Sequence, residues 1–253
     1  MLCFFFNLKA QISILGEMTH EKNAMPGEVY QGTIVIQNGG NEVESMRIYQ
    51  TDFSFKSDGT NNYGEPGTLP RSNATWISFS PKQTTIQPHE TANINYFITV
   101  PEDNSLLGTY WSMMMVESIP EIPTEEPAGD LAIRVVMRYG IQMITNIGDT
   151  GTRQLRFINP ELAKEGDQKI FKIDIENIGE RWLRPDVWIE LYTIEGVSCG
   201  TYKGTQSRIY PETSARFKID ISNVTSGTYK ALVVADCGEE DLFGVNYTLE
   251  IGE

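Results

Sequence analysis

The chain has 253 residues, enough for one large domain or two of ordinary size. Lysine and arginine number 20 and aspartate and glutamate 34, so the formal net charge is −14. This charge disfavours nucleic acid and anionic membranes as partners, because both attract clustered Lys and Arg. Hydrophobic residues make up 40% and charged residues 21%, so the chain can bury a core and is not a disordered polyanion. Aromatic residues at 10% favour β-sheet over helix bundles.

The N-terminus begins with a short apolar segment, residues 2–6, and reaches Ala10 before polar, alternating sequence starts. Residues 1–11 are therefore interpreted as the remnant of a secretory signal peptide cleaved near Ala10, although Leu8 stands where a small residue is expected. A first strand that packs its phenylalanines is the alternative. No later apolar run approaches the roughly 20 residues that span a bilayer. We expect an exported, soluble chain without a transmembrane segment.

Alternation of apolar and polar residues dominates the rest of the sequence. It is clear in Val29–Asn38, in 94–100 and in 169–177, and Gly, Pro, Asn and Asp separate such segments. Period-two alternation is typical of half-buried antiparallel strands, and many short strands with turn residues between them indicate β-sandwiches. The single helix-like stretch, 160–165, is expected to form one turn in a loop.

Three landmarks occur twice in the same order. Asn-Gly closes a strand at Asn38, and Asn-Ile-Gly does so at Asn177; a Pro-containing turn precedes a strand at Pro88 and at Pro211. Gly-Thr-Tyr then opens an apolar strand at 108–110 and again at 227–229. A Tyr in this place resembles the tyrosine corner of immunoglobulin-like sandwiches. The repeat predicts two immunoglobulin-like domains in tandem, 12–147 and 148–253, with the boundary in the turn-rich stretch 148–152.

A long acidic, Pro-rich loop precedes the last strand of the first domain. The loop, 118–130, holds three prolines and four acidic residues and is expected to be exposed. Residues 131–147 then read as one long strand. The odd positions from 131 to 139 are apolar: Leu131, Ile133, Val135, Met137 and Tyr139. The opposite face carries two arginines, Arg134 and Arg138.

The second domain contains two pairs of interest. Trp182 and Trp188 are separated by an even number of residues and so share a strand face, where they either pack in the core or form a surface that binds sugar or protein. If Cys3 is removed with a signal peptide, Cys199 and Cys237 remain. An even pair in an exported chain permits one disulfide, and two unlinked buried cysteines are the alternative.

The sequence offers little for catalysis or metal binding. The acidic clusters at 58–65 and 236–241 lack the spacing of a calcium loop and are interpreted as solvated turns. His20 and His89 have no Cys or His at ligand spacing, and neither a nucleophile elbow nor a phosphate-binding Gly-rich loop is present. We therefore expect no metal, no cofactor and no enzymatic activity.

With these residues in hand, the first domain resembles the N-terminal domain of periplasmic pilus chaperones. The pattern consists of an opening strand at 12–18, a strand ending at Asn38, the segments 76–81 and 86–90, a strand ending at Val100-Pro101, Gly-Thr-Tyr at 108–110, and the long loop with the long last strand over 119–147. The same pattern is similar to cell-surface proteins that interact with WxL-type proteins. The second domain resembles a generic bacterial immunoglobulin-like module.

The resemblance implies that the last strand of the first domain binds an incomplete partner sandwich by β-strand addition. The residues implied to contact the partner are Leu131, Ile133, Val135 and Met137; in the alternative, they face the protein's own core. In the family an Arg on the first strand and a Lys on the last hold a partner's terminal carboxylate. Arg134 or Arg138 matches the last-strand position, but 12–18 has no basic residue and carries Glu17 instead.

The sequence therefore predicts an exported, non-catalytic protein, periplasmic or at the cell surface, that binds protein subunits of the envelope or of a pilus by strand addition. The alternative is a cell-envelope adhesion or scaffold module that binds surface protein or glycan. An open edge at 131–137 favours the first function, and a closed sandwich with exposed Trp182 and Trp188 favours the second.

Overall fold

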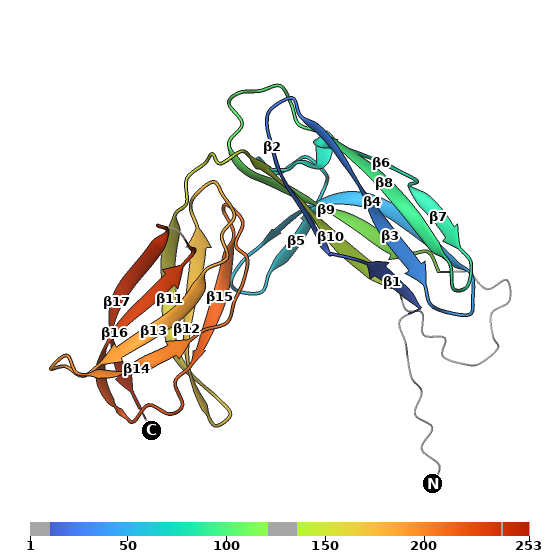
Figure 1. Cartoon of the computed structure of the whole chain (residues 1–253). Helices are drawn as coiled ribbons and strands as arrows, with labels where there is room; N and C mark the ends of the chain where they lie inside the picture. The colour runs from blue at the N-terminus through green and yellow to red at the C-terminus, as the bar shows by residue number, and fades with distance from the viewer. Residues whose placement is uncertain (1–10, 121–135, 239, 253) are drawn as a thin grey trace, which may run out of the picture. The chain divides into compact units, whose positions relative to one another are not determined.

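The computed structural model describes residues 11–120, 136–238 and 240–252, and in these residues it is built almost entirely of β-strands (Figure 1). The chain divides into two compact units. The first contains the residues up to Phe53 together with Tyr63–Leu106 and Tyr110–Gly148, and the second contains Ser54–Asn62, Leu107–Thr109 and the chain from Asp149 onward. Each unit has two sheets, which confirms the predicted all-β fold of two immunoglobulin-like sandwiches.

Two sheets form the first unit. One has the strand order β1-β3-β8-β6, with bounds β1 (Ile12–Leu15), β3 (Val29–Asn38), β6 (Ile77–Ser80) and β8 (Thr91–Thr99). The other has the order β2-β10-β9-β4-β5, with β7 also paired to β4. Its strands are β2 (Thr19–Ala24), β4 (Glu44–Phe55), β5 (Asn61–Gly64), β7 (Gln83–Ile86), β9 (Gly108–Ser118) and β10 (Arg138–Ile147). A single 3₁₀ turn, Ala74–Trp76, leads into β6.

The beginning of the chain changes from one sheet to the other. β1 runs antiparallel to the last four residues of β3, and β2 runs parallel to the second half of β10. Between them lies Gly16 with φ +95°, a conformation that glycine adopts without the steric cost of a Cβ. The opening strand predicted at 12–18 therefore ends earlier, at Leu15, and a separate strand begins at Thr19, because a single straight strand cannot pair with both sheets.

Alternation places one face of each strand of the first unit in a common core. In β8 every second residue is buried, including Ile94, Tyr96 and Ile98. Met114 of β9 and Ile141 of β10 join the same cluster from the second sheet. Met137 and Tyr139 pack partly against it. Burial of this apolar surface is the main term that holds the two sheets together.

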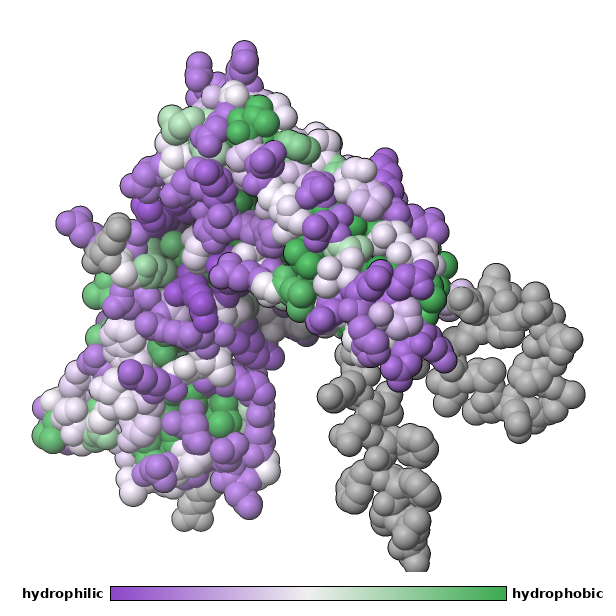
Figure 2. Space-filling view, turned by 45° about the vertical axis from the view of Figure 1, so that its right-hand side comes forward, coloured by the Kyte–Doolittle hydropathy of each residue, from purple (hydrophilic) through white to green (hydrophobic). Residues whose placement is uncertain are grey.

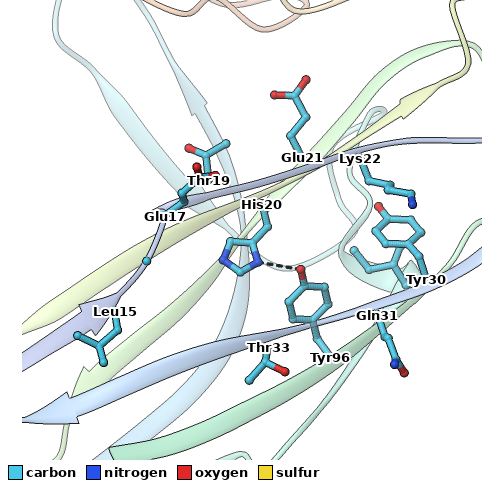
Figure 3. Close-up of a pocket in the computed structure, with 12 residues that line it drawn as sticks. Leu15, Glu17, Thr19, His20, Glu21, Lys22, Tyr30, Gln31, Thr33 and Tyr96 are labelled. Carbon is cyan, nitrogen blue, oxygen red and sulfur yellow. Dashed lines mark hydrogen bonds between the residues drawn. The ribbon is translucent and has the colours of Figure 1, made fainter.

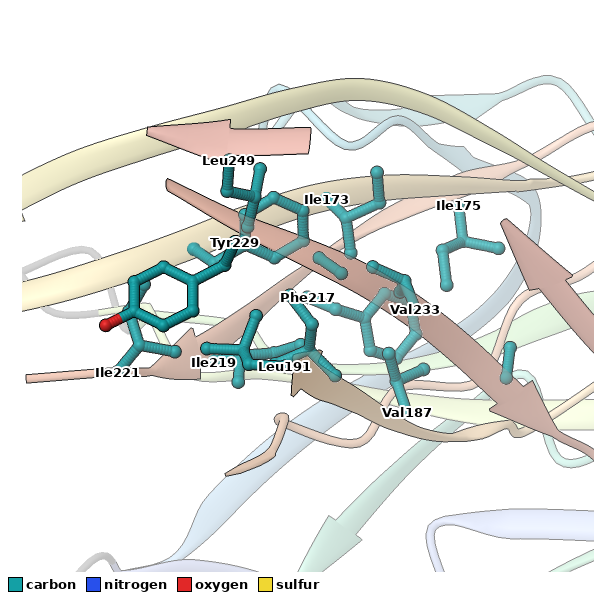
Figure 4. Packing of buried hydrophobic residues seen from close by; sticks show 14 of the residues in the cluster. Ile173, Ile175, Val187, Leu191, Phe217, Ile219, Ile221, Tyr229, Val233 and Leu249 are labelled. Carbon is teal, nitrogen blue, oxygen red and sulfur yellow. The ribbon is translucent and has the colours of Figure 1, made fainter. Parts of the chain in front are cut away.

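The second unit has its own core between two sheets. The first sheet has the order β11-β12-β15 and the second β14-β13-β16-β17. The bounds are β11 (Leu155–Glu165), β12 (Gln168–Asn177), β13 (Asp186–Tyr192), β14 (Ser198–Lys203), β15 (Ser214–Asp220), β16 (Gly227–Asp236) and β17 (Leu242–Ile251). Phe217, Ile173 and Val233 converge between the sheets (Figure 4).

The repeated Asn landmarks make the same hydrogen bonds in the two units. The Asn38 side chain donates to the carbonyls of Glu42 (2.7 Å) and Ile86 (3.0 Å), and its Oδ1 accepts from Gly40 N–H at 2.9 Å. The corresponding partners of Asn177 are Arg181 (2.7 Å), Ile209 (3.0 Å) and Gly179 (2.9 Å). Both side chains are fully buried. The repeated sequence landmark is thus a repeated structural link between a strand end and two loops.

The Tyr of the Gly-Thr-Tyr landmark differs between the units. The Tyr229 hydroxyl donates to the Thr225 carbonyl at 2.9 Å, as expected of a tyrosine corner. In the first unit the ring of Tyr110 instead lies 4.7 Å from that of Trp76, centroid to centroid. The predicted corner is therefore found in the second unit, and Tyr110 has a different aromatic neighbour.

The helical turn predicted over 160–165 is wrong, because these residues belong to strand β11. The register of β11 against β12 shifts between Ile158 and Glu161, and Asn159 has φ +53°. Proline is tolerated in an edge strand or at a bulge, where no ladder hydrogen bond is lost. Pro160 lies at this bulge of an edge strand, so its presence did not exclude a strand.

The disulfide that the sequence permits does not form, and the alternative of two unlinked cysteines is found: Cys199 and Cys237 are both free, half-buried thiols. Cys199 lies in β14 beside the Leu191 end of β13, and Cys237 follows Asp236, which pairs with Asp186 at the other end. Five residues of strand separate these ends by about 17 Å, whereas a disulfide joins Cα atoms less than about 7 Å apart. Burial, with a smaller effect of nearby carboxylates, raises the pKa of the Cys237 thiol to about 12.

Candidate functional site

The leading half of β10 forms an edge of its sheet. β9 lies on one side of β10 and β2 on the other (Figure 1). Pairing with β2 begins only at Gln142, which faces Thr19 and whose N–H donates to the Met18 carbonyl at 2.9 Å. Over 138–141, no strand in the described parts of the chain pairs with β10 on this side.

The direction of the peptide groups shows which of them face this open side. The Ser118 N–H donates to the Met137 carbonyl at 2.9 Å, so Met137 faces β9. Peptide groups alternate in direction along a strand, so those of Arg138 and Gly140 point the same way as that of Gln142. The N–H and C=O groups of Arg138 and Gly140 therefore point to the side where the described chain supplies no strand.

Gly140 allows this edge to lie close to two methionine side chains. A Cβ at Gly140 would come within 3.1 Å of Met113 Cε and 3.4 Å of Met115 Sδ. Both methionines are buried and belong to β9. The unbranched thioether of methionine adapts easily to a changing neighbour. The sheet next to the open edge thus has a deformable apolar layer.

A buried carboxylate holds the first residue of β10. Glu117 accepts hydrogen bonds from Arg138 Nε at 2.5 Å and from the Tyr49 hydroxyl at 2.8 Å, and it forms an ion pair with Arg47. The Glu117 side chain is 8% exposed, while those of Arg47 and Arg138 are 56% and 54% exposed. β4, β9 and β10 each contribute to this cluster, so it fixes the start of β10 against its neighbours.

The pKa of Glu117 is determined by two opposing effects. Burial alone raises the pKa of a carboxyl group, but the hydrogen bonds from Tyr49, Arg47 and Arg138 outweigh it, and the pKa of Glu117 lies below its ordinary value. The hydrogen bond between Arg138 and Glu117 also raises the pKa of Arg138. Both groups therefore stay ionised, and the guanidinium of Arg138 already has a carboxylate partner within the chain.

The structure reaches only part of the sequence-predicted partner site. Leu131, Ile133, Arg134 and Val135 lie outside the described residues. Met137 packs partly against the core of the first unit, and Arg138 is the first residue of β10. Of the predicted partner site, the structure therefore describes only Met137 and Arg138, which lie at the start of β10.

A cavity of about 400 Å³ lies where the chain switches from β1 to β2 (Figure 3). Its floor is a pair in which His20 Nδ1 and the Tyr96 hydroxyl share a hydrogen bond of 2.7 Å. Tyr96 lies directly over Gly32, where a Cβ would collide with the Tyr96 hydroxyl. Tyr30 completes the wall, and its hydroxyl is hydrogen bonded to Thr145 Oγ1 at 2.8 Å.

Burial shifts the titration of the groups in this cavity. Desolvation lowers the pKa of His20, and interactions with Glu17 only partly oppose this effect. Desolvation likewise raises the pKa of Tyr30 to about 12. The neutral forms of both groups are therefore favoured, and the charged residues that line the cavity are Glu17, Glu21 and Lys22.

The predicted tryptophan pair has two separate environments. The guanidinium carbon of Arg208 lies 4.0 Å from the centroid of the Trp182 ring. Trp188, in β13, donates from its indole N–H to Glu190 Oε1 at 3.0 Å. Trp188 lines a cavity in the second unit together with residues of β14 and β16.

Sequence reasoning missed Glu117 and His20. Glu117 ends an otherwise apolar strand, which is a signal, but its partners Arg47 and Arg138 can be assigned only when the register of three strands is known. His20 lies in a short polar segment, and its burial depends on the strand switch at Gly16, which no pattern in the sequence indicates.

Three further properties of the described residues concern the surface, metal binding and the membrane. On the face shown in Figure 2, hydrophobic residues form small patches separated by hydrophilic ones. Among the described residues, no three His, Cys, Asp or Glu side chains are arranged to hold a metal ion. No helix in that part of the chain is long and apolar enough to cross a membrane.

No protein-family model matches the sequence, and no curated protein sequence matches it. Several solved structures are similar to the chain. The YadV chaperone is 14% identical with a TM-score of 0.46, covering 94% of this chain and 100% of its own. The class 5 fimbriae chaperone CfaA is 13% identical with a TM-score of 0.49, covering 94% and 98%. The CsuC–CsuE chaperone–tip adhesion subunit complex of Acinetobacter baumannii is 14% identical with a TM-score of 0.48, covering 93% and 98%.

Proposed function

We propose that this chain is an exported, non-catalytic binding protein that captures partner protein subunits by β-strand addition along the leading half of β10. One observation carries the proposal: the backbone groups of Arg138 and Gly140 point away from β9, before the pairing with β2 begins at Gln142. A row of unpaired N–H and C=O groups is a template for another strand. In the described residues this edge has no covering strand.

The sequence of the preceding residues suits the same template. Period-two alternation places Leu131, Ile133 and Val135 on one face with Met137. In strand addition, main-chain hydrogen bonds hold the guest strand and alternate side chains fill its groove. The partner is therefore a β-rich subunit that lacks a strand, exposes an apolar groove and pairs with residues 131–141. We propose that these partners are subunits of the cell envelope or of a pilus, and that the chain binds them in the periplasm or at the cell surface.

Arg138 has a positioning role in this proposal. Its guanidinium is held by Glu117, so it does not act as a free anchor for a partner's terminal carboxylate. Instead the ion pair fixes the strand at the point where pairing with a guest strand ends and pairing with β2 begins. Arg134 remains the residue proposed to contact an acidic group of the partner.

A pair of substitutions at one position tests the proposal. Arg138→Pro removes the outward N–H, and the first residue of a strand is a place where proline is tolerated. Arg138→Ala removes the same side chain and keeps the N–H. Tagged full-length chains are used to isolate bound subunits from envelope extract, with Val135→Lys as a third variant. We expect a β-rich subunit to be retained by the wild type, retained in part by Arg138→Ala, which loses the ion pair with Glu117 but keeps the outward N–H, and lost from Arg138→Pro and Val135→Lys.

The contrary result is equally clear. If Arg138→Pro and Arg138→Ala retain the same amount of subunit, the outward backbone groups do not hold the partner. If neither the wild type nor any folded variant retains a subunit, the strand-addition function is rejected. Circular dichroism of each variant shows whether the sandwich is intact before binding is compared.

A further inference from the structure

A second concave site lies in the second unit, apart from the edge of β10. It is a cavity of about 580 Å³ on the outer face of the sheet formed by β14, β13, β16 and β17. The residues that matter for its chemistry are Trp188 and the polar side chains Asp186, Asp236, Thr201, Lys203 and Gln206. A cavity of this volume is in the range of small-ligand sites, which combine apolar surface with a few convergent polar groups.

The strand register places these side chains on one surface. Trp188 of β13 lies opposite Lys203 of β14, and the next outward position on β13, Glu190, lies opposite Thr201. Asp186 lies opposite Asp236 of β16. Residues directly opposite one another on neighbouring strands have their Cβ atoms about 5 Å apart. The aromatic ring therefore lies between Lys203 of β14 and the apolar Val234 of β16, with the carboxylates of Asp186 and Asp236 at the next outward position along the sheet.

The indole of Trp188 is held in a fixed orientation. Its N–H donates to one oxygen of Glu190 at 3.0 Å, and the Tyr192 hydroxyl donates to the other at 2.6 Å. These hydrogen bonds lower the pKa of Glu190, so the carboxylate stays ionised and keeps both donors. A ring that is already ordered loses less entropy when a ligand stacks on it.

Two further contacts order the rim without filling the cavity. Gln206 Nε2 donates to Asp186, and Arg184 donates to Gln206 Oε1 at 3.2 Å. At the back of the cavity is Gly204, whose N–H donates to the Val187 carbonyl at 2.7 Å. A Cβ at Gly204 would come within 3.1 Å of Ile219 Cγ1 and 3.2 Å of the Val187 carbonyl oxygen, so glycine lets this wall of the cavity lie close against the core.

The mixture of polar groups selects the class of ligand. Asp186 and Asp236 accept hydrogen bonds, Lys203 donates them, and Thr201 and Gln206 do both. An anionic ligand meets two carboxylates, and a cationic ligand meets the ammonium of Lys203. A neutral polyhydroxylated molecule has donors and acceptors for all of these groups, and its apolar C–H face fits an aromatic ring. We propose that this cavity binds a neutral saccharide.

The saccharide site is independent of the strand-addition proposal, because its residues all belong to the second unit. It gives the chain a way to contact a glycan surface whether or not the first unit holds a protein subunit. Of the two tryptophans considered in the sequence analysis, only Trp188 lines this saccharide site; Trp182 does not.

The test uses the full-length chain labelled with ¹⁵N and a panel of neutral disaccharides: cellobiose, maltose, mannobiose and N,N′-diacetylchitobiose. We expect at least one of them to shift the indole N–H resonance of Trp188 and the backbone resonances of Asp186 and Asp236. Trp188→Leu is expected to weaken that binding at least about tenfold, which corresponds to ~1.4 kcal/mol. Trp182→Leu, which removes an indole from outside the cavity, should leave the affinity unchanged.

Three results would overturn the inference. One is that no sugar of the panel moves the Trp188 resonance at about 10 mM, a concentration that reveals even weak binding. Another is that choline or acetate, as charged probes, moves the cavity resonances while the sugars do not. The third is that Trp182→Leu weakens sugar binding as much as Trp188→Leu when both variants keep the wild-type spectrum elsewhere.

Discussion

At the scale of single residues, Asn38 and Asn177 show how a repeated sequence landmark becomes a repeated structural element. Each is fully buried and uses its amide group to bind one N–H and one carbonyl of the loop that follows its strand and a second carbonyl from a segment distant in the chain, Ile86 or Ile209. A buried polar group left without a partner costs more than a hydrogen bond contributes. This requirement explains why both units have Asn, rather than an apolar residue, at the end of a central strand.

Asn177→Ala is therefore expected to lower the free energy of unfolding by about 2–4 kcal/mol, since it removes the donor to the Arg181 carbonyl, one of two donors to the Ile209 carbonyl, and the acceptor of the Gly179 N–H. Urea denaturation of the full chain measures the change. Asn246→Ala, at an exposed position of β17, is the matched control and should change stability by less than about 0.5 kcal/mol. Equal effects of the two substitutions would show that the buried amide has no special role.

His20 gives the first unit a pH dependence. Desolvation lowers the pKa of His20 in the folded state below the value of about 6.5 that it has in the unfolded chain. The unfolded state then binds more protons, so this contribution to stability is present above the unfolded pKa and is lost as the pH falls below it. We expect the free energy of unfolding to fall between about pH 7 and pH 5, and His20→Gln to remove part of this slope. An unchanged slope in His20→Gln would contradict this assignment.

At the scale of strands and turns, the sequence predicts well what depends on local alternation. Most strands of both units follow from the period-two pattern, as in Val29–Asn38. What it could not predict depends on register: the position of Cys199 relative to Cys237, the three partners of Glu117, and the point at which β2 begins to cover β10. The bulge of β11 was missed because Pro160 and its neighbours read as a turn, while pairing with β12 kept them in the sheet.

Two glycine substitutions within strands should have opposite effects. At Gly32 a Cβ would collide with the ring of Tyr96, so Gly32→Ala is expected to displace that ring, break its hydrogen bond to His20, and cost about 1–3 kcal/mol. At Gly244 the nearest atoms are 3.5 Å away, an ordinary contact. Gly244→Ala is expected to be neutral or to stabilise by up to about 1 kcal/mol. Thermal unfolding of both variants measures the two changes in stability. If Gly32→Ala and Gly244→Ala lower the stability by similar amounts, the packing described around these two glycines is contradicted.

At the scale of the whole molecule, the two largest hydrophobic clusters correspond to the two units, and a small third cluster of Ala24, Val100 and Ile147 belongs to the first. One cluster is built from residues of β1 to β10, and the other from residues of β12 to β17 with their connecting loops. The repeat in the sequence predicts two domains of this kind. The strand order within each sheet came only from the structure, because antiparallel strands with similar alternation can be paired in several orders.

Phe217→Ala tests whether each core supports its own unit. Phe217 is fully buried in the core of the second unit, and removing such a ring typically costs about 3–5 kcal/mol. Hydrogen exchange should show faster opening of the amides in β12 to β17, with little change for those of β3 and β8. If the amides of β3 and β8 open to the same extent, the two cores do not fold as separate units.

Amide hydrogen exchange along β10 in the free, full-length protein shows whether the leading half of this strand has an open edge. We expect alternation: the amides of Arg138 and Gly140 exchange rapidly, those of Tyr139 and Ile141 are protected by β9, and Gln142 is protected by its bond to Met18. If Arg138 and Gly140 are as well protected as Gln142 in the free protein, the edge is already covered, and a guest strand has no place to bind there.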